Sequence, residues 1–287
     1  MLIRNDWNHR LDCVWQRVRR RLGRLGEICR YAGRRPAHSQ MFYVVTCQRN
    51  AGTHVLRCLD SVHTQRYPGD NYRHICIDDA STDGTDRLIE KWLANHPGHR
   101  VEFVRNQERQ GGTANTVRGF GQAPIDSVVL ELNGDDWLPD PGVFDFLNRV
   151  YSDHEVWMTY NTLCYPDGRI PPWAKPYPRT VVVANAYRDC PDWSSSHLHS
   201  FRRPLFDHIR PETFIDPLTD ELWESADDQA IYLAMLELAG RHARHLERIT
   251  YVYNFWEQSH IYESTQESEQ RAARIRRGER YSPLVRL

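Results

Sequence analysis

The chain has 287 residues, of which 40% are hydrophobic and 26% charged, and its formal net charge is −1. This length supports a sizeable hydrophobic core, and the composition excludes disordered, collagen-like and low-complexity chains. No apolar run approaches the roughly 20 residues of a membrane-spanning helix, and the charged first ten residues argue against a cleaved secretory signal.

The seven cysteines are scattered and form neither a CxxC pair nor a zinc-binding Cys/His spacing. An odd number of separated thiols in a chain of this length is typical of a reducing compartment. We therefore expect a cytoplasmic protein, with peripheral attachment at the inner membrane surface as an alternative.

Residues 1–38 are predicted to form an amphipathic helical extension. Apolar residues recur at steps of three and four from Trp7 to Ile28, and five arginines stand on the other face within positions 17–24. The predicted helix, residues 1–35, has three candidate roles: packing on its own domain, self-association, and anchoring on an anionic surface such as a membrane.

From residue 41 onward, short apolar segments typical of strands alternate with amphipathic segments typical of helices. Strands are predicted at 41–46, 74–78, 101–104 and 127–132, and helices at 51–65, through Leu88, Ile89 and Trp92, and at 113–121. This alternation predicts an α/β fold with a doubly wound, mostly parallel sheet. Right-handed crossovers place the carboxyl ends of the strands, and any ligand, along one edge.

The second half of the chain, at 151–262, is less regular and richer in aromatic residues and proline. A helix is predicted at 226–239 and a closing strand at 249–255. We divide the chain into the N-terminal extension, a first half at 39–150, this second half, and a polar helical tail at 263–287.

Polar clusters follow three of the predicted strands, at 46–50, 78–84 and 133–136. Each cluster alone is an ordinary strand-to-helix turn, because Asp, Asn, Ser and Gly favour caps and turns. Three clusters on one edge predict a shared ligand site. Acidic side chains on such a loop suit a hard divalent cation, which can neutralise a departing diphosphate.

Several nucleotide-binding and hydrolytic motifs are absent. The sequence has no GxxxxGK[S/T] loop and no GxSxG elbow, and no GxGxxG follows the first strand. These absences exclude a P-loop NTPase and argue against a dinucleotide-dependent oxidoreductase. The remaining candidate is a site that binds the phosphates of a nucleotide through carboxylates and a metal ion.

Four segments resemble the motifs of family 2 glycosyltransferases in order and spacing: TCQRN at 46–50, IDDASTDGT at 77–85, GGTAN at 111–115 and LNGDDWL at 132–138. The stretches SHLHSFR at 196–202, ADDQA at 226–230 and YVYN at 251–254 also resemble family motifs. The resemblance spans about residues 41–262. It implies the GT-A fold, a Rossmann-like doubly wound mixed sheet, and inverting transfer of a sugar from a nucleotide-sugar donor to a hydroxyl.

The resemblance also implies roles for individual residues. Asp135 would hold a divalent metal, Mn²⁺ or Mg²⁺, on the diphosphate of the donor, for which a UDP-sugar is expected. Asp228 takes the position of the general base, which accepts the proton of the acceptor hydroxyl. The residues expected at the donor are Thr46, Cys47, Asn50, Asp78, Asp79, Asn115, Asn133 and Asp135.

Some positions depart from the family pattern or leave alternatives open. Asn133 replaces the usual Asp, and its uncharged amide would weaken metal binding. Asp227 competes with Asp228 for the role of base, although both also suit a helix N-terminus. The residues expected near acceptor or phosphate are Asp227, His197, His199, Arg202 and His260, with a surface positive patch as the alternative for the basic ones.

The acceptor is expected to be a cell-surface glycan, as in many relatives. One alternative is a modified nucleic-acid base, with the arginine-rich first helix binding phosphates. A second alternative is a degenerate relative that binds a nucleotide or glycan without catalysis.

Overall fold

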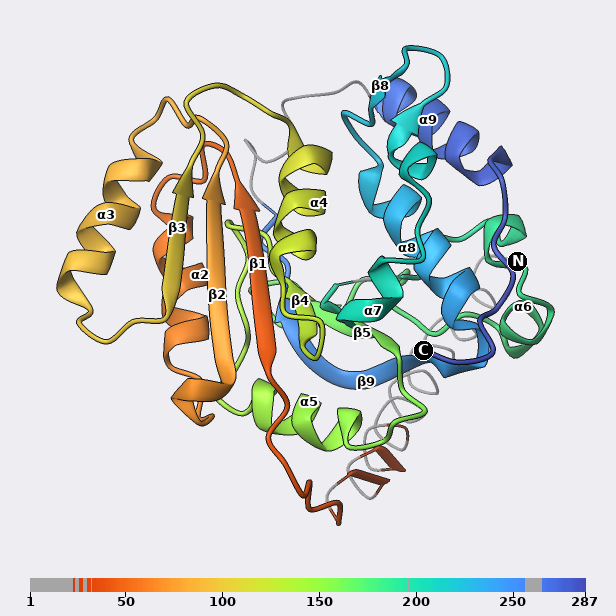
Figure 1. The fold of residues 1–287 in the computed structure, drawn as a ribbon, viewed down its shortest axis with the longest axis horizontal. Helices are drawn as coiled ribbons and strands as arrows, with labels where there is room; N and C mark the ends of the chain where they lie inside the picture. Colours follow the sequence, from red (N-terminus) through yellow and green to blue (C-terminus); the bar gives the residue numbers. More distant parts are fainter. Residues whose placement is uncertain (1–22, 24–25, 28–29, 32, 196, 256–264) are drawn as a thin grey trace, which may run out of the picture.

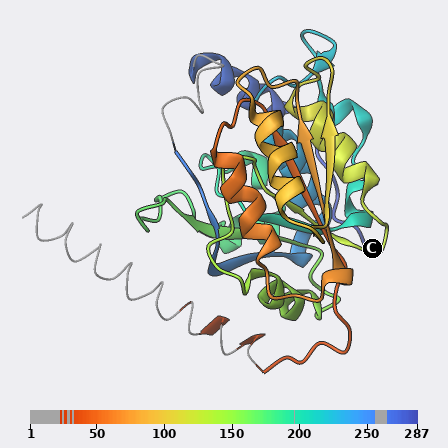
Figure 2. The same cartoon turned by 90° about the vertical axis from the view of Figure 1, so that its left-hand side faces the viewer.

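The computed structural model describes residues 23, 26–27, 30–31, 33–195, 197–255 and 265–287. In these residues one seven-stranded sheet carries helices on both faces (Figures 1 and 2). Most of the predicted helix at 1–35, and His260, lie outside the described residues, so the expectations about them stay predictions. Within the described part of the chain, no helix has the length and apolar character that crossing a bilayer requires.

The sheet is mixed, and its strand order is β3-β2-β1-β4-β6-β5-β9. Strands β1, β2, β3 and β4 run parallel to one another, whereas β6 runs antiparallel to both β4 and β5. The predicted doubly wound mixed sheet is confirmed. The strands are β1 (Phe42–Gln48), β2 (Tyr72–Asp78), β3 (Val101–Arg105), β4 (Val128–Glu131), β5 (Met158–Cys164), β6 (His199–Arg202) and β9 (Ala243–Val252), and a separate hairpin joins β7 (Ile215–Asp216) to β8 (Glu221–Leu222).

The helices form two layers around the sheet (Figure 1). One layer contains α2 (His54–His63), α3 (Thr85–Asn95) and α5 (Val143–Tyr151), and the other contains α4 (Gly112–Gln122), α7 (Arg203–Phe206) and α8 (Asp227–Ala239). The remaining helices are α6 (Arg179–Ala184) and α9 (Thr265–Arg277).

Strand β1 is buried on both faces because its successive side chains alternate between the two helix layers. Tyr43 and Val45 belong to the core cluster that includes residues of α4 and α8. Phe42 and Val44 belong to the cluster that includes residues of α2 and α5. The strand is therefore covered by helices on both sides.

The close approach of α4 to β1 depends on Gly119. A Cβ atom on Gly119 would lie 2.4 Å from Cγ1 of Val45. We expect Gly119→Ala to lower the free energy of unfolding by about 1–3 kcal/mol, because the added methyl group forces the helix away from the sheet. Gly121→Ala on the same helix is the matched control, since its Cβ position has no atom within 4 Å. It should leave stability unchanged or raise it by up to about 1 kcal/mol. Urea unfolding measures both variants, and equal losses in the two would contradict the close packing.

Residues near the C-terminus hold α8 in place. Arg188 Nε donates to Glu237 Oε1 at 2.8 Å, and the two side chains are 3% and 0% exposed. The other oxygen of Glu237 accepts the backbone N–H of Tyr281 at 3.1 Å, and Arg188 also donates to the carbonyl of Ile275 at 2.5 Å. A buried ion pair is tolerated only while its partners stay in place. Residues 275–281 therefore anchor the helix that contains Asp228.

Candidate active site

A cleft of about 720 Å³ opens at the carboxyl ends of β1, β2 and β4. The arrowheads of the first three strands lie at the same end of the molecule as the first turns of α4 and α8 (Figure 1). The predicted site residues that line the cleft are Cys47, Asn50, Asp79, Asn115, Asn133, Asp135, His197, Asp227 and Asp228. The structure thus gathers most of the predicted residues at one site.

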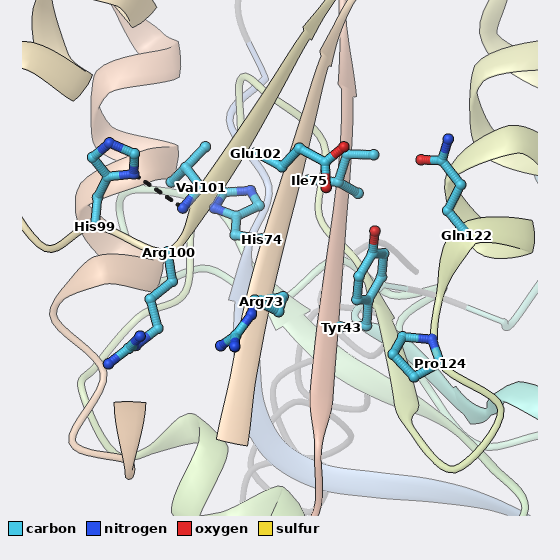
Figure 3. A pocket seen from close by; sticks show the side chains of 10 residues that line it. All are labelled: Tyr43, Arg73, His74, Ile75, His99, Arg100, Val101, Glu102, Gln122 and Pro124. Carbon is cyan, nitrogen blue, oxygen red and sulfur yellow. Dashed lines mark hydrogen bonds between the residues drawn. The ribbon is translucent and has the colours of Figure 1, made fainter. Parts of the chain in front are cut away.

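A second hollow, of about 530 Å³, lies at the opposite end of the strands (Figure 3). Its wall includes Tyr43, Arg73 and Glu102 from the strands and Gln122 at the end of α4. None of the predicted site residues lines it. The cleft at the carboxyl edge is therefore the candidate active site.

Asp79 organises the side of the cleft that α4 forms. Its carboxylate accepts the backbone N–H groups of Gln110 at 2.7 Å and Gly111 at 2.9 Å, and Nδ2 of Asn106 at 2.9 Å. Burial raises the pKa of Asp79, but these hydrogen bonds outweigh burial, and the pKa lies below its usual value. Asn106 also donates to Asn115 at 2.8 Å. The network fixes the start of α4, in agreement with the loop-supporting role that the resemblance implies for Asp79.

Asp78 and Asn50 shape the loops beneath the cleft. The fully buried carboxylate of Asp78 accepts the hydroxyl of Ser81 at 2.5 Å and Nε2 of Gln48. Asn50 has a left-handed φ of 53°, and its side-chain oxygen accepts the backbone N–H of Thr82 at 2.8 Å. Asp78 is thus a support of the loop, which corrects the expectation that it contacts the donor directly.

Thr46 lies inside the layer of α2, where its hydroxyl is 3.8 Å from Sγ of Cys58. Its side chain is fully buried, and its hydroxyl lies 2.8 Å from Nε2 of His74. Cys47, the next residue, points the opposite way and lines the cleft. The expectation that Thr46 binds the donor is therefore corrected: this residue belongs to the core.

Thr46→Val tests this correction. We expect the variant to lose about 1–3 kcal/mol of unfolding free energy, because Nε2 of His74 loses its partner. Its affinity for UDP should equal that of the parent protein. Urea unfolding and calorimetric titration with UDP measure the two quantities, and a tenfold loss of UDP affinity would place Thr46 at the donor after all.

The loop after β4 presents one carboxylate to the cleft and buries the next. Asp136 accepts the backbone N–H of Asn254 at 2.6 Å and the hydroxyl of Tyr251, while burial and the neighbouring Asp135 raise its pKa. Asn133 and Asp135 line the cleft. Asp136 therefore fixes the loop, and the side-chain oxygens of Asn133 and Asp135 are the donor atoms suited to a hard divalent cation.

Asp227 and Asp228 form the opposite wall of the cleft at the start of α8. Ala226, with a left-handed φ of 56°, turns the chain into the helix. Burial, Asp228 and Glu131 raise the pKa of Asp227 to about 7, and burial also raises the pKa of Asp228. A carboxylate with a raised pKa is a stronger base, which suits a group that removes a hydroxyl proton.

The raised pKa of Asp227 opposes folding at neutral pH. The pKa of this carboxyl is 3.8 in the unfolded chain and about 7 in the folded protein. The folded protein therefore becomes less stable relative to the unfolded chain as the pH rises from the lower to the higher of these values. We expect Asp227→Asn to raise the unfolding free energy by about 1–2 kcal/mol at pH 8 and to have little effect at pH 4. Urea unfolding at the two pH values measures this, with Asp126→Asn on the exposed surface as control. An equal gain at both pH values would contradict the titration.

Glu131, His197 and His199 meet at the floor of the cleft. Oε2 of Glu131 lies 3.8 Å from Nδ1 of His197 and 3.5 Å from Nδ1 of His199, and it accepts the hydroxyl of Tyr232 at 2.7 Å. Burial raises the pKa of Glu131, but these neighbours outweigh burial and lower it overall, whereas burial lowers the pKa of His197 to about 4. His197 reaches the cleft, while His199 lies fully buried behind it. The sequence analysis does not include Glu131 among the site residues, although a carboxylate at the end of an apolar strand indicates a position at the ligand edge of the sheet.

Arg202 lies at the far end of β6. Because β6 is antiparallel to β4, Arg202 pairs with Val128, the first residue of β4. Its guanidinium donates to the carbonyl oxygens of Val156 at 2.9 Å and Tyr151 at 2.8 Å. The expectation that Arg202 binds phosphate or acceptor is therefore corrected.

The mixed sheet with a carboxylate-lined cleft at its edge is the architecture of the GT-A glycosyltransferases. The chain belongs to glycosyl transferase family 2, whose model matches residues 43–214. A stretch of 119 residues is 30% identical to chondroitin synthase of Escherichia coli, and it covers 39% of this chain and 16% of that protein. This chain thus corresponds to a small part of that relative.

Solved structures share the fold at low sequence identity. TarS 1–349 of S. aureus in complex with UDP-GlcNAc has a TM-score of 0.62 and 16% identity, and the match covers 82% of this chain and 65% of that one. The mannosyltransferase PcManGT of Pyrobaculum calidifontis in complex with GDP-Man and Mn²⁺ has a TM-score of 0.56 and 17% identity, and the match covers 84% and 68%.

Proposed function

We propose that the protein transfers a sugar from a nucleotide-diphosphate donor to an acceptor hydroxyl, with inversion at the anomeric carbon. The observation that carries the proposal is the arrangement of the cleft. Asp135 lies on a loop suited to a metal, and Asp227 and Asp228, whose pKa values are raised, face the same space from α8. Membership of family 2 supports the same reaction.

The first half of the chain would bind the donor. Asp135, with the amide oxygen of Asn133, would hold Mn²⁺ or Mg²⁺, which neutralises the charge of the departing diphosphate. The cleft walls also include the first turn of α4, whose N–H groups favour an anion. Bound UDP-GlcNAc and GDP-Man in the similar structures support a nucleotide-sugar donor, of which we propose a UDP-sugar.

Asp228 is the proposed general base. It would accept the proton of the acceptor hydroxyl while that oxygen forms a bond to the anomeric carbon and the bond to the diphosphate breaks on the opposite face. The family resemblance favours Asp228 for this role, and the adjacent Asp227, whose pKa burial raises to about 7, is the alternative base. Asp228 also accepts the backbone N–H of Gln229 at 2.8 Å, which orients its carboxylate.

The acceptor is proposed to be a glycan bound by the second half of the chain. Its support is the family resemblance together with the relative named chondroitin synthase. The acceptor would approach the α8 side of the cleft, where Asp228 and His197 lie.

Calorimetric titration with UDP, GDP, UDP-GlcNAc and GDP-mannose tests the proposal, each in Mn²⁺, in Mg²⁺ and in EDTA. We expect metal-dependent binding of one nucleotide class, followed by slow release of the nucleoside diphosphate from the matching sugar donor. Binding without turnover would favour a non-catalytic nucleotide-binding protein. No binding under any of the conditions would overturn the proposed donor site.

A further inference from the structure

Three side chains at the floor of the cleft aim their ligand atoms at one point. Glu131, His197 and His199 each offer one ligand atom, and these three atoms lie within 4.8 Å of one another. Oε2 of Glu131 faces Nδ1 of both histidines. The carboxylate oxygen is 3.8 Å and 3.5 Å from the two nitrogens. A tetrahedral ion with ligand distances of about 2.1 Å requires about 3.4 Å between ligand atoms. The two distances from Glu131 are close to this value, and the ligand atoms that lie furthest apart would have to approach by up to about 1.4 Å to enclose an ion.

The hydrogen bonds of His199 leave its Nδ1 as an acceptor. Its Nε2 lies 3.2 Å from the carbonyl oxygen of Ser195 and 3.0 Å from the hydroxyl of the same residue. A carbonyl only accepts, so Nε2 carries a hydrogen, and in the tautomer with that single hydrogen the ring presents a lone pair at Nδ1. An N–H held by a backbone carbonyl is the usual support of a metal-binding histidine.

The two Nδ1 atoms face the carboxylate without a hydrogen-bond partner among the described residues. His199 is fully buried, so its nitrogen is out of reach of bulk solvent. Lone pairs of a neutral imidazole and of a carboxylate repel each other when they converge in a buried place. A cation between them removes this conflict.

We propose that Glu131, His197 and His199 bind a first-row transition-metal ion of the zinc class, separate from the divalent cation at Asp135. Two imidazoles and one carboxylate form the ligand set of catalytic zinc sites that keep a coordination position open. Imidazole ligands favour zinc, copper, iron and nickel, whereas Mg²⁺ prefers oxygen. Glu131 and His197 line the cleft together with Asp228, so the open position faces the acceptor side.

The surroundings hold the ligands in place before any ion binds. Glu131 and His199 are paired across β4 and β6. The ring of Tyr232 stacks on His199 with 3.5 Å between ring centroids, and its hydroxyl donates to Glu131. His197 stacks on Tyr251 with an interplanar angle of 21°. Ligands fixed by such contacts lose little freedom when they bind an ion.

Titration of the metal-free full chain with Co²⁺, followed by visible absorption, tests the proposal. We expect one equivalent of Co²⁺ to give the strong d–d bands of a four-coordinate ion. Zn²⁺ should displace it, and an equal concentration of Mg²⁺ should not. Glu131→Gln and His197→Gln should each weaken Zn²⁺ binding at least about 10–100-fold. Circular dichroism establishes that both variants keep the fold.

Control variants distinguish metal binding at this site from metal binding by other residues of the chain. Asp135→Ala and the surface variant His154→Gln should keep the cobalt spectrum unchanged, so the result does not depend on the proposed donor site. Full Zn²⁺ affinity in Glu131→Gln and His197→Gln would overturn the proposal. Absence of Co²⁺ and Zn²⁺ binding to the parent chain would also overturn it. Glu131 and His199 would then share a proton and not a metal ion. A cobalt–thiolate charge-transfer band would overturn it by placing the ion on a cysteine such as Cys47.

Discussion

Asp228→Asn is expected to lower the rate of sugar transfer by about 10²- to 10⁴-fold and to leave nucleotide affinity unchanged. The amide fills the same space but cannot accept the proton of the attacking hydroxyl, and this range is the usual contribution of a general base. The measurement is release of the nucleoside diphosphate from the nucleotide sugar that the parent protein turns over, alongside calorimetric titration with the nucleotide.

Asp227→Asn is the matched variant for this prediction, because the two carboxylates are adjacent on α8 and both line the cleft. It should keep most of the transfer rate if Asp228 is the base. Full activity in Asp228→Asn together with loss of activity in Asp227→Asn would reverse the two assignments. Loss of nucleotide affinity in Asp228→Asn would instead show that the residue acts in donor binding.

Asp135→Ala is expected to weaken Mn²⁺-dependent binding of UDP by at least about 100-fold, or about 2.7 kcal/mol. Asp136 is already hydrogen-bonded to Tyr251 and Asn254, and residue 133 is an amide, so Asp135 is the one carboxylate that this loop presents to the cleft. Calorimetric titration with UDP in Mn²⁺ and in EDTA measures the loss.

Asn133→Asp provides the opposite test at the same loop. A second carboxylate should tighten Mn²⁺ binding by about tenfold, since hard cations gain from each added oxygen charge. Equal affinities of the parent protein for UDP in Mn²⁺ and in EDTA would contradict a metal at this loop. Tighter binding in Asn133→Asp with no effect of Asp135→Ala would move the metal to residue 133.

The sequence predicts well which residues of the first half of the chain line the cleft, because local patterns determine their positions. Parallel strands end at the same edge, so polar residues directly after β1, β2 and β4 must lie near one another. Thr46 is the exception on β1, because it is buried and does not reach the donor, and the alternation of side chains along the strand accounts for this. Residues alternate along a strand, and Thr46 has the same parity as Phe42 and Val44, which face α2 and α5.

The other half of the cleft depends on pairings that no local pattern reveals. The antiparallel direction of β6 puts His199 beside Glu131 and sends Arg202 to the far end of the sheet. β6 is only four residues long and lies between β4 and β5, so its neighbours are distant in the sequence. The cluster of Glu131, His197 and His199 therefore emerges only from the folded structure.

The anchoring of α8 by the C-terminal residues limits how far the chain can be trimmed. Removing residues 275–281 would take away the Tyr281 N–H and the Ile275 carbonyl, and would open the Arg188–Glu237 pair to water. Each hydrogen-bond partner taken from a buried charged group costs about 1–3 kcal/mol, so the two together amount to a large part of the stability of most proteins. A shortened protein could thus keep every residue of the cleft and still lose activity. Natural shortening or fusion at this end should therefore spare the chain up to Tyr281.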